Sequence, residues 1–196
     1  MIARPKLYLA GPEVFLRNAV EIGRRKKESC AEYGFEGLFP FDNEIDPDAS
    51  GARIDWLIYR ANIAMIRDAD GGIFNLTPFR GPSADVGTVF ELGLLAGLGK
   101  PVFAYTNDGS SLLERMKRSG DAAYDAAAVQ WFDRAGMRIE DFGKVDNLMI
   151  DACLAQQGDD HFVRCTATES TVLDDLEGFV ACLDRASRYF STNRPE

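Results

Sequence analysis

Residues 68–105 read DADGGIFNLTPFRGPSADVGTVFELGLLAGLGKPVFAY, and this stretch decides the fold. Gly71 to Leu76 is a short apolar run, which predicts a buried parallel strand. The prolines, glycine and serine of residues 77–84 predict a loop, and from Asp85 the apolar residues follow a helical period. The GKP sequence ends that helix, and Pro101 to Tyr105 predicts the next strand. The order of strand, helix and strand indicates a parallel sheet with helical crossovers.

The predicted helix carries two carboxylates close to its start. Glu91 lies six residues after Asp85, about 9 Å along the axis at about 1.5 Å per residue, and its side chain leans back over Gly87 and Thr88. A carboxylate in an apolar helix is costly to bury, so we expect a ligand to need Glu91; the alternative is a satisfied or half-exposed glutamate. Gly87 leaves room beside it for a small ring. Asp85 is equally compatible with a ligand-binding role and with a helix cap.

The composition excludes several classes of function. A chain of 196 residues with a hydrophobic share of 46% fits one globular domain, residues 1–196. The net charge of −9 argues against nucleic acid or an acidic membrane as a partner. No apolar run is long enough to span a bilayer, and the first residues, MIARPKLYLAGPE, predict a strand rather than a signal peptide. We therefore expect a cytoplasmic protein.

The sequence offers no clear metal or cofactor site. Cys30, Cys153, Cys165 and Cys182 are widely spaced and form no CxxC pair, which argues against zinc or redox chemistry. His161 is the only histidine and lies in a polar stretch, so Ser-His or Cys-His catalysis is poorly supported. If the chain is an enzyme, carboxylates and hydroxyls must carry its proton chemistry.

Strands and helices are predicted to alternate along the rest of the chain. Further strands are expected at Lys6 to Ala10 and Phe35 to Phe39. Helices are expected at Val14 to Tyr33, Ile54 to Arg67, Asp121 to Arg134 and Thr171 to Phe190. Residues 24–27 would form a solvated basic face, and Asp42 to Gly51 an acidic loop. The segment Gly109 to Lys144 is compatible with a lid or with a dimerisation element.

In such sheets, ligands bind beyond the carboxyl ends of the strands. The residues expected at that edge are Gly11, Pro12, Glu13, Phe41, Asp42, Thr77 to Asp85 and Tyr105 to Asp108. No GxGxxG follows the first strand and no Walker loop is present, so a dinucleotide or nucleoside triphosphate site is poorly supported.

Three segments resemble the nucleoside 2-deoxyribosyltransferase family: YLAGPEVF at Tyr8 to Phe15, NLTPFRGPSADVGTVFELG at Asn75 to Gly93, and DNLM at Asp146 to Met149. The resemblance extends from Lys6 to about Ile150, and DxGxxxE, from Asp85 to Glu91, is its most specific part. It implies a flavodoxin-like α/β fold, with a parallel sheet of about five strands and helices on both faces. It also implies a cytoplasmic enzyme of nucleotide salvage that moves 2-deoxyribose from one nucleobase to another.

The resemblance implies a role for each matching residue. Glu91 would be the nucleophile that attacks the anomeric carbon, and the Tyr8 hydroxyl would orient it. Asp85 would bind sugar hydroxyls. Asn147 would bind the sugar of a neighbouring subunit, and Met149 beside it would help to position the nucleophile. The family likeness therefore implies a homo-oligomer with a shared active site.

The base side of the site departs from the family pattern. The best-known members of the family carry, on the helix before the third strand, an aspartate that acts as an acid on the base, and this chain places Asn62 there. An amide hydrogen-bonds a purine edge but donates no proton as an acid at neutral pH. Either Asp42 serves as the acid, or hydrogen bonding and solvent activate the base. Gly11, Gly87 and the loop around Arg80 are the other expected substrate contacts.

We therefore expect transfer of 2-deoxyribose by double displacement with retention, through a glutamyl ester, with a 2′-deoxynucleoside and a free nucleobase as substrates and without a cofactor. The first alternative is a nucleoside or nucleotide N-glycosidic hydrolase. Related nucleotide hydrolases tend to carry serine where Asp85 stands; a carboxylate there would repel a 5′-phosphate by on the order of several kcal/mol, which favours nucleosides. Ser83 and Arg80 keep this alternative open. The second alternative is a binding module without turnover.

Overall fold

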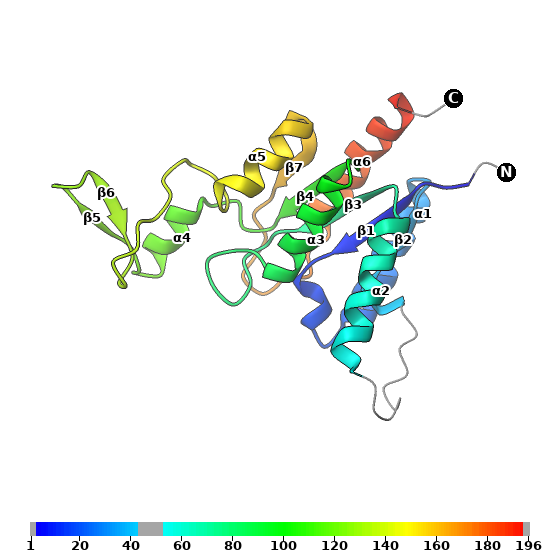
Figure 1. Cartoon of the computed structure of the whole chain (residues 1–196), viewed down its shortest axis with the longest axis horizontal. Helices are drawn as coiled ribbons and strands as arrows, with labels where there is room; N and C mark the ends of the chain where they lie inside the picture. Colours follow the sequence, from blue (N-terminus) through cyan, green and yellow to red (C-terminus); the bar gives the residue numbers. More distant parts are fainter. Residues whose placement is uncertain (1–2, 43–52, 194–196) are drawn as a thin grey trace.

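The computed structural model describes residues 3–42 and 53–193. At its centre is a five-stranded parallel sheet with the strand order β2-β1-β3-β4-β7 (Figure 1). The strands are β1 Lys6–Ala10, β2 Glu36–Leu38, β3 Gly71–Asn75, β4 Val102–Thr106 and β7 Phe162–Arg164. This is the order of flavodoxin-like sheets, so the predicted fold class is confirmed.

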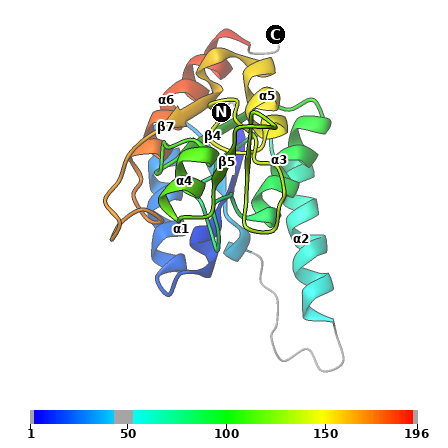
Figure 2. The ribbon, with the colours of Figure 1, turned by 90° about the vertical axis from the view of Figure 1, so that its left-hand side faces the viewer.

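Helices cover both faces of the sheet, as Figure 2 shows. One face carries α1 Ala19–Glu32 and α6 Glu177–Thr192; the other carries α2 Ile54–Asp68, α3 Val86–Gly97 and α5 Leu148–Gln157. Three short 3₁₀ turns complete this part of the chain: η1 Pro12–Phe15, η2 Pro40–Asp42 and η3 Asp159–His161. No helix in the described ranges is long and apolar enough to cross a membrane.

Alternation along β1 decides which side chains meet which helices. Leu7 and Leu9 belong to the core beneath α1 and α6, whereas Tyr8 and Ala10 belong to the core beneath α2, α3 and α5. Successive side chains of a strand point to opposite faces, so this division follows from the strand itself. Parallel pairing of Tyr8 with Gly72 places β1 directly beside β3, and the chain leaves β3 toward α3. Tyr8 therefore lies beneath the helix that carries Glu91.

An arm projects from the sheet beyond β4 (Figure 1). It consists of α4 Leu112–Arg118 and an antiparallel hairpin of β5 Ala123–Asp125 and β6 Gln130–Phe132. Leu113, Met116 and Ile139 form a small core of its own at the base.

The predicted helix at Asp121 to Arg134 is wrong, because this segment contains the hairpin. Three successive alanines favour a helix, but the Asp125 carboxylate accepts hydrogen bonds from the backbone N–H groups of Ala127 and Ala128 and forms a turn. The aromatic residues that follow pair across the turn; Tyr124 lies opposite Trp131.

Two other predicted helices begin too early. The expected helix from Val14 is a 3₁₀ turn followed by α1, and the closing helix begins at Glu177 rather than Thr171. The basic face of α1 is only partly solvated, because Lys26 is fully buried. Of the expected acidic loop, only Asp42 lies within the described residues.

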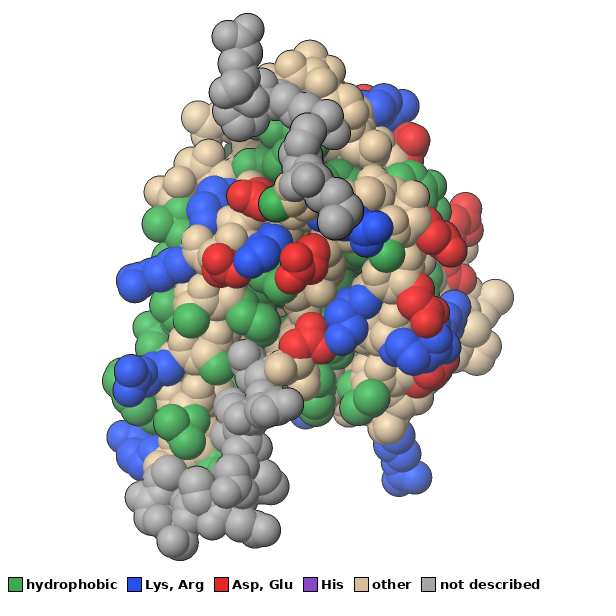
Figure 3. All heavy atoms as spheres, turned by 90° about the vertical axis from the view of Figure 1, so that its right-hand side faces the viewer, with side chains coloured by type: hydrophobic (Ala, Val, Ile, Leu, Met, Phe, Trp, Pro, Cys, Tyr) green, Lys and Arg blue, Asp and Glu red, His purple; other side chains and the backbone are tan. Residues whose placement is uncertain are grey.

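The surface opposite the arm mixes charges of both signs (Figure 3). On α1, Arg24 pairs with Glu21 and with Glu28, which lie about one helical turn to either side of it. Among the described residues on this face, basic and acidic side chains are interspersed and do not form a basic stripe of the kind that follows a nucleic-acid backbone.

We predict that Leu95→Ala lowers the free energy of unfolding by about 2–5 kcal/mol, because this α3 side chain is fully buried against the sheet. Leu98→Ala, at the C-cap of the same helix, is the control; its side chain is 45% exposed, and we expect a loss below about 1 kcal/mol. Urea unfolding measures both values. Equal losses would contradict the orientation of α3.

Candidate active site

A cavity of about 620 Å³ opens at the carboxyl ends of β1 and β3. It lies where η1, η2 and the first turns of α2 and α3 meet. Its lining residues are Gly11, Val14, Phe15, Pro40, Phe41, Ile54, Ile58, Asn62, Asp85, Gly87, Thr88 and Glu91. This is the sheet edge at which the sequence predicts a ligand.

The start of α3 supplies the polar wall. Asp85 is the N-cap residue, and its Oδ2 accepts hydrogen bonds from the Thr88 backbone N–H at 2.9 Å and the Thr88 hydroxyl at 3.0 Å. Residues 85, 88 and 91 are three apart, so they share one face of the helix. Gly87 adds no side chain there, and the space beside Glu91 stays open. Asp85 is thus both a cap and part of the cavity wall.

Glu91 is held by two donors from different elements. The Tyr8 hydroxyl donates to Glu91 Oε1 at 2.8 Å, and the Asn62 side-chain amide of α2 donates to the same oxygen at 3.3 Å. Within the described part of the chain, no donor bonds the second oxygen, Oε2. The geometry fixes the carboxylate and leaves one oxygen for a reacting atom in the cavity.

The surroundings shift the acidity of both members of this pair. Burial raises the pKa of Glu91 above its ordinary value, and the Asp85 carboxylate adds to the rise, while the hydrogen bonds from Tyr8 and Asn62 oppose it. Burial and then the neighbouring Glu91 carboxylate also raise the pKa of Tyr8. Tyr8 therefore stays protonated and acts as a donor.

A buried ion pair supports the wall at Gly11. Lys26 and Glu13 are both fully buried and contact each other through Nζ and Oε1. Asn75 at the end of β3 donates to the other oxygen of Glu13 at 3.0 Å. A Cβ at Gly11 would lie 2.6 Å from the Asn75 Cβ and would overlap the Glu13 carboxylate. Glycine at this position lets the chain pass between the cavity and the ion pair.

The opposite wall is apolar and aromatic. Phe15 and Phe41 are 52% and 54% exposed, and both line the cavity together with Ile54 and Ile58. The sequence analysis expected Phe41 at this edge of the sheet, but it did not assign Phe15, Ile54 or Ile58 to the site. Ile54, Ile58 and Asn62 are four residues apart on α2, and this spacing could have indicated a common face.

Four predicted contacts lie outside this cavity. Asp42 accepts from the Phe39 backbone N–H at 2.9 Å and pairs with Lys27. Arg80 lies at the rim, with its guanidinium 5.0 Å from the Phe15 ring centroid.

Asn147 and Met149 lie at the start of α5, where both are exposed. Asn147 caps that helix by accepting from the Met149 N–H and donates to Glu140. The structure thus brings together Tyr8, Gly11, Asn62, Asp85, Gly87 and Glu91 and places the other predicted residues elsewhere.

The remaining candidates for acid–base or metal chemistry are remote. His161 is buried, hydrogen-bonds the Val102 carbonyl at 2.7 Å and stacks on Phe103, at the amino end of β4. In residues 3–42 and 53–193, no cluster of three or more His, Cys, Asp or Glu side chains is arranged to hold a metal. Among the described residues that line the cavity, the carboxylates are those of Asp85 and Glu91.

We predict that Glu91→Gln raises the midpoint of thermal unfolding at pH 7. A folded-state pKa above the unfolded value favours the protonated form, so its stabilising contribution is lost as pH rises through the folded pKa. A permanently neutral glutamine escapes this cost, and the difference from wild type should vanish toward pH 4.

Unfolding scans between pH 4 and pH 8 measure this difference, with the exposed Glu169→Gln as the control. A difference that is absent or independent of pH would contradict the burial of a charged Glu91.

Comparisons with known proteins identify the family. The sequence model of the nucleoside 2-deoxyribosyltransferase family matches residues 7–149. The chain is 33% identical over 166 residues to the uncharacterized protein C191.05c of Schizosaccharomyces pombe, a match that covers 79% of each chain.

Solved structures agree. A 2-desoxiribosyltransferase from Leishmania mexicana has a TM-score of 0.60 and 26% identity, over 97% of this chain and 99% of that chain. A conserved protein from Enterococcus faecalis V583, with a TM-score of 0.53 and 18% identity over 88% of this chain and 97% of that one, shares the fold. The resemblance seen in the motifs is confirmed, and the chain belongs to the nucleoside 2-deoxyribosyltransferase family of enzymes.

Proposed function

We propose that the protein transfers 2-deoxyribose between nucleobases by double displacement through a glutamyl ester at Glu91. One observation carries the proposal: a half-buried carboxylate is held through a single oxygen by Tyr8 and faces a cavity whose other wall is aromatic. A carboxylate beside the anomeric carbon stabilises an oxocarbenium-like centre, and the apolar wall fits a flat, uncharged base.

In the first step, Glu91 Oε2 bonds to C1′ of the deoxyribose as the C1′–N bond breaks. The base leaves with the electron pair of that bond and takes up a proton from solvent. In the second step, a ring nitrogen of the incoming base bonds to C1′ as the C1′–Oε2 ester bond breaks; the nitrogen loses its proton to solvent, and the Glu91 carboxylate is released. Two inversions give net retention at C1′. Tyr8 remains protonated throughout and keeps Oε1 out of the reaction.

Asp85 is proposed to accept a hydrogen bond from the 5′-hydroxyl of the sugar. Its carboxylate lines the same cavity as Glu91, and only its Oδ2 is used by Thr88. A 5′-phosphate in that place would face two carboxylates, so the arrangement supports nucleosides over nucleotides.

On the base side, Asn62 and the rings of Phe15 and Phe41 are proposed to contact the nucleobase. Asp42 pairs with Lys27 and caps a turn, so its position supports activation of the base by hydrogen bonding and solvent rather than by this carboxylate. Arg80 on the rim is close enough to Phe15 to form the outer edge of the base site.

A neighbouring subunit is proposed to complete the site in a homo-oligomer. Asn147 and Met149 do not line the cavity of their own chain, and Met149 is 69% exposed. Such side chains are available to a second copy. We further place the enzyme in cytoplasmic nucleotide salvage, which this reaction serves.

The alternative activity is hydrolysis of a nucleoside or nucleotide at the same bond. Arg80 favours it, since its guanidinium lies at the cavity rim in the loop that also contains Ser83, where a phosphate could be met. The family assignment favours an enzyme over a binding module.

We predict that incubation with 2′-deoxyinosine and adenine yields 2′-deoxyadenosine, and that Glu91→Ala lowers this exchange by roughly 10³-fold or more, because the covalent route is lost. Chromatography of the products measures both rates, with Glu169→Ala as an exposed control. Free deoxyribose without exchange, or turnover of a nucleotide alone, would select the alternative; exchange by Glu91→Ala near the wild-type rate would remove Glu91 from the mechanism.

We also predict that mixing inactive Glu91→Ala chains with inactive Asn147→Ala chains restores part of the exchange activity. A mixed oligomer would contain sites that combine an intact Glu91 with an intact Asn147 of the neighbour. The mixture is assayed after subunit exchange has been established with differently tagged chains. Mixed oligomers that stay inactive would show that Asn147 does not act across an interface.

A further inference from the structure

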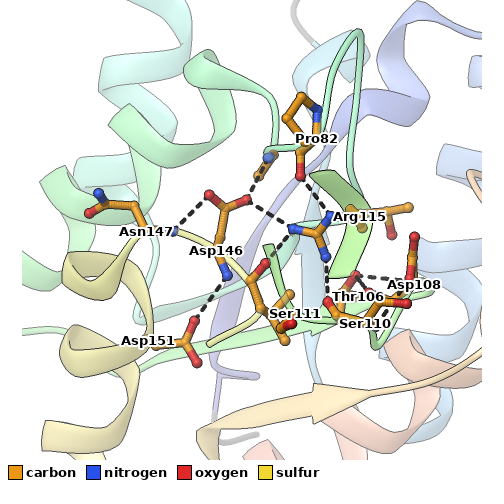
Figure 4. A network of polar contacts seen from close by, with 12 residues as sticks. Pro82, Thr106, Asp108, Ser110, Ser111, Arg115, Asp146, Asn147 and Asp151 are labelled. Atoms are coloured by element: carbon orange, nitrogen blue, oxygen red, sulfur yellow. Dashed lines mark hydrogen bonds and ion pairs between the residues drawn. The ribbon is translucent and has the colours of Figure 1, made fainter. Parts of the chain in front are cut away.

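A buried arginine from the arm holds the loop in front of α3. Arg115 of α4 is 5% exposed, and its guanidinium donates to the carbonyl of Pro82 at 2.7 Å, to that of Ser110 at 2.5 Å and to that of Val145. Figure 4 shows Pro82 and Ser110 on two sides of the Arg115 guanidinium, and Val145 is the acceptor from a third segment. The cation thus connects the loop after β3, the loop after β4 and the approach to α5.

Asp146 pairs with Arg115 and contacts the same loop before α3. Its carboxylate lies 3.9 Å from the Arg115 guanidinium and is 3% exposed. Oδ2 accepts from the Ala84 backbone N–H at 2.8 Å, and Oδ1 accepts from the Asn147 backbone N–H at 2.8 Å (Figure 4). The two members of the ion pair therefore bind the chain at residues 82 and 84.

These two attachment points lie directly before Asp85. The loop contains two prolines and two residues with positive φ, Arg80 and Gly81, and the hydrogen bond from the Phe79 N–H to the Ser83 carbonyl closes it on itself. This turn ends at Ser83, and the contacts of Arg115 with Pro82 and of Asp146 with Ala84 hold the chain on either side of that residue, just before Asp85. Burying an ion pair costs desolvation energy, and in some proteins such a pair is kept because it fixes one conformation of the chain.

We propose that Arg115 and Asp146 are positioning residues that set the Asp85 carboxylate for the 5′-hydroxyl of the sugar. The inference rests on the proposed function, in which Asp85 binds that hydroxyl. Asp146 of the same pair also binds the backbone N–H of Asn147. The ion pair would therefore orient both Asp85 in the chain's own site and Asn147, which is proposed to act in the site of a neighbouring subunit. This gives the base of the arm a part in the reaction without any contact with the substrate.

The test compares two substrates that differ only at the hydroxyl in question, 2′-deoxyinosine and 2′,5′-dideoxyinosine, each with adenine as acceptor. The measured quantity is the kcat/KM for 2′-deoxyinosine divided by the kcat/KM for 2′,5′-dideoxyinosine. Partial unfolding lowers both rates equally and leaves the ratio unchanged, whereas a displaced Asp85 lowers it. We expect Arg115→Met and Asp85→Ala each to reduce the ratio by about tenfold or more, and the double variant to show no further reduction.

Arg118→Met is the matched control, because Arg118 lies on the same helix with its side chain 62% exposed; its ratio should equal that of the wild type. Arg115→Lys keeps the charge without the fork of donors and should lie between wild type and Arg115→Met. Where Arg115→Met does not fold, Arg115→Lys and Asp146→Asn supply the measurement, and a reduced ratio in either supports the inference.

An unchanged ratio in the folded variants overturns the inference and leaves the proposed function intact. Failure of all three to fold gives the pair a purely structural role and also overturns it. A wild-type enzyme that turns over both substrates equally removes the role of Asp85 and the inference with it. A wild-type chain without activity on any 2′-deoxynucleoside overturns the proposed function first.

Discussion

The site depends on the hydrogen bond between the Tyr8 hydroxyl and Glu91. It joins the first strand to the helix after the third strand, and it exists because parallel pairing puts those strands side by side. A shift of one residue in β1 would turn the hydroxyl to the face of α1 and α6 and leave Glu91 without its strongest partner. The register of a buried strand therefore determines the chemistry of the cavity.

Local patterns predicted the part of the site that a single helix presents. Asp85, Thr88 and Glu91 share a face by helical geometry alone, and the loop and glycine around them mark the start of α3 in the sequence. Alternating strands and helices admit few sheet topologies, so the sequence restricts the strand order to a small number of possibilities. The fold class and the position of Glu91 at the sheet edge were accordingly within reach of the sequence.

Contacts between distant segments were not within reach. Lys26 looks like part of a solvated basic run, yet it is buried because Glu13 lies opposite. Arg115 has three carbonyl acceptors, and a backbone carbonyl leaves no trace in the residue type that bears it. The hairpin at residues 123–132 was missed because alanine propensity outweighs a turn made by one aspartate. In each case a single long-range or turn contact overrides the local preference.

The ionised Glu91 carboxylate is energetically unfavourable in this cavity, and the fold does not need a charge there. Burial and the Asp85 carboxylate both disfavour an ionised Glu91, and among the described residues the hydrogen bonds from Tyr8 and Asn62 oppose them. A cationic side chain in place of Asn62 would stabilise the ionised Glu91 more strongly. It would also neutralise the negative charge that an oxocarbenium-like centre requires. An amide and a protonated phenol hold the carboxylate in place while leaving its charge available. These two neutral donors are therefore consistent with the proposed role of Glu91 as the nucleophile, a role in which stability is exchanged for reactivity.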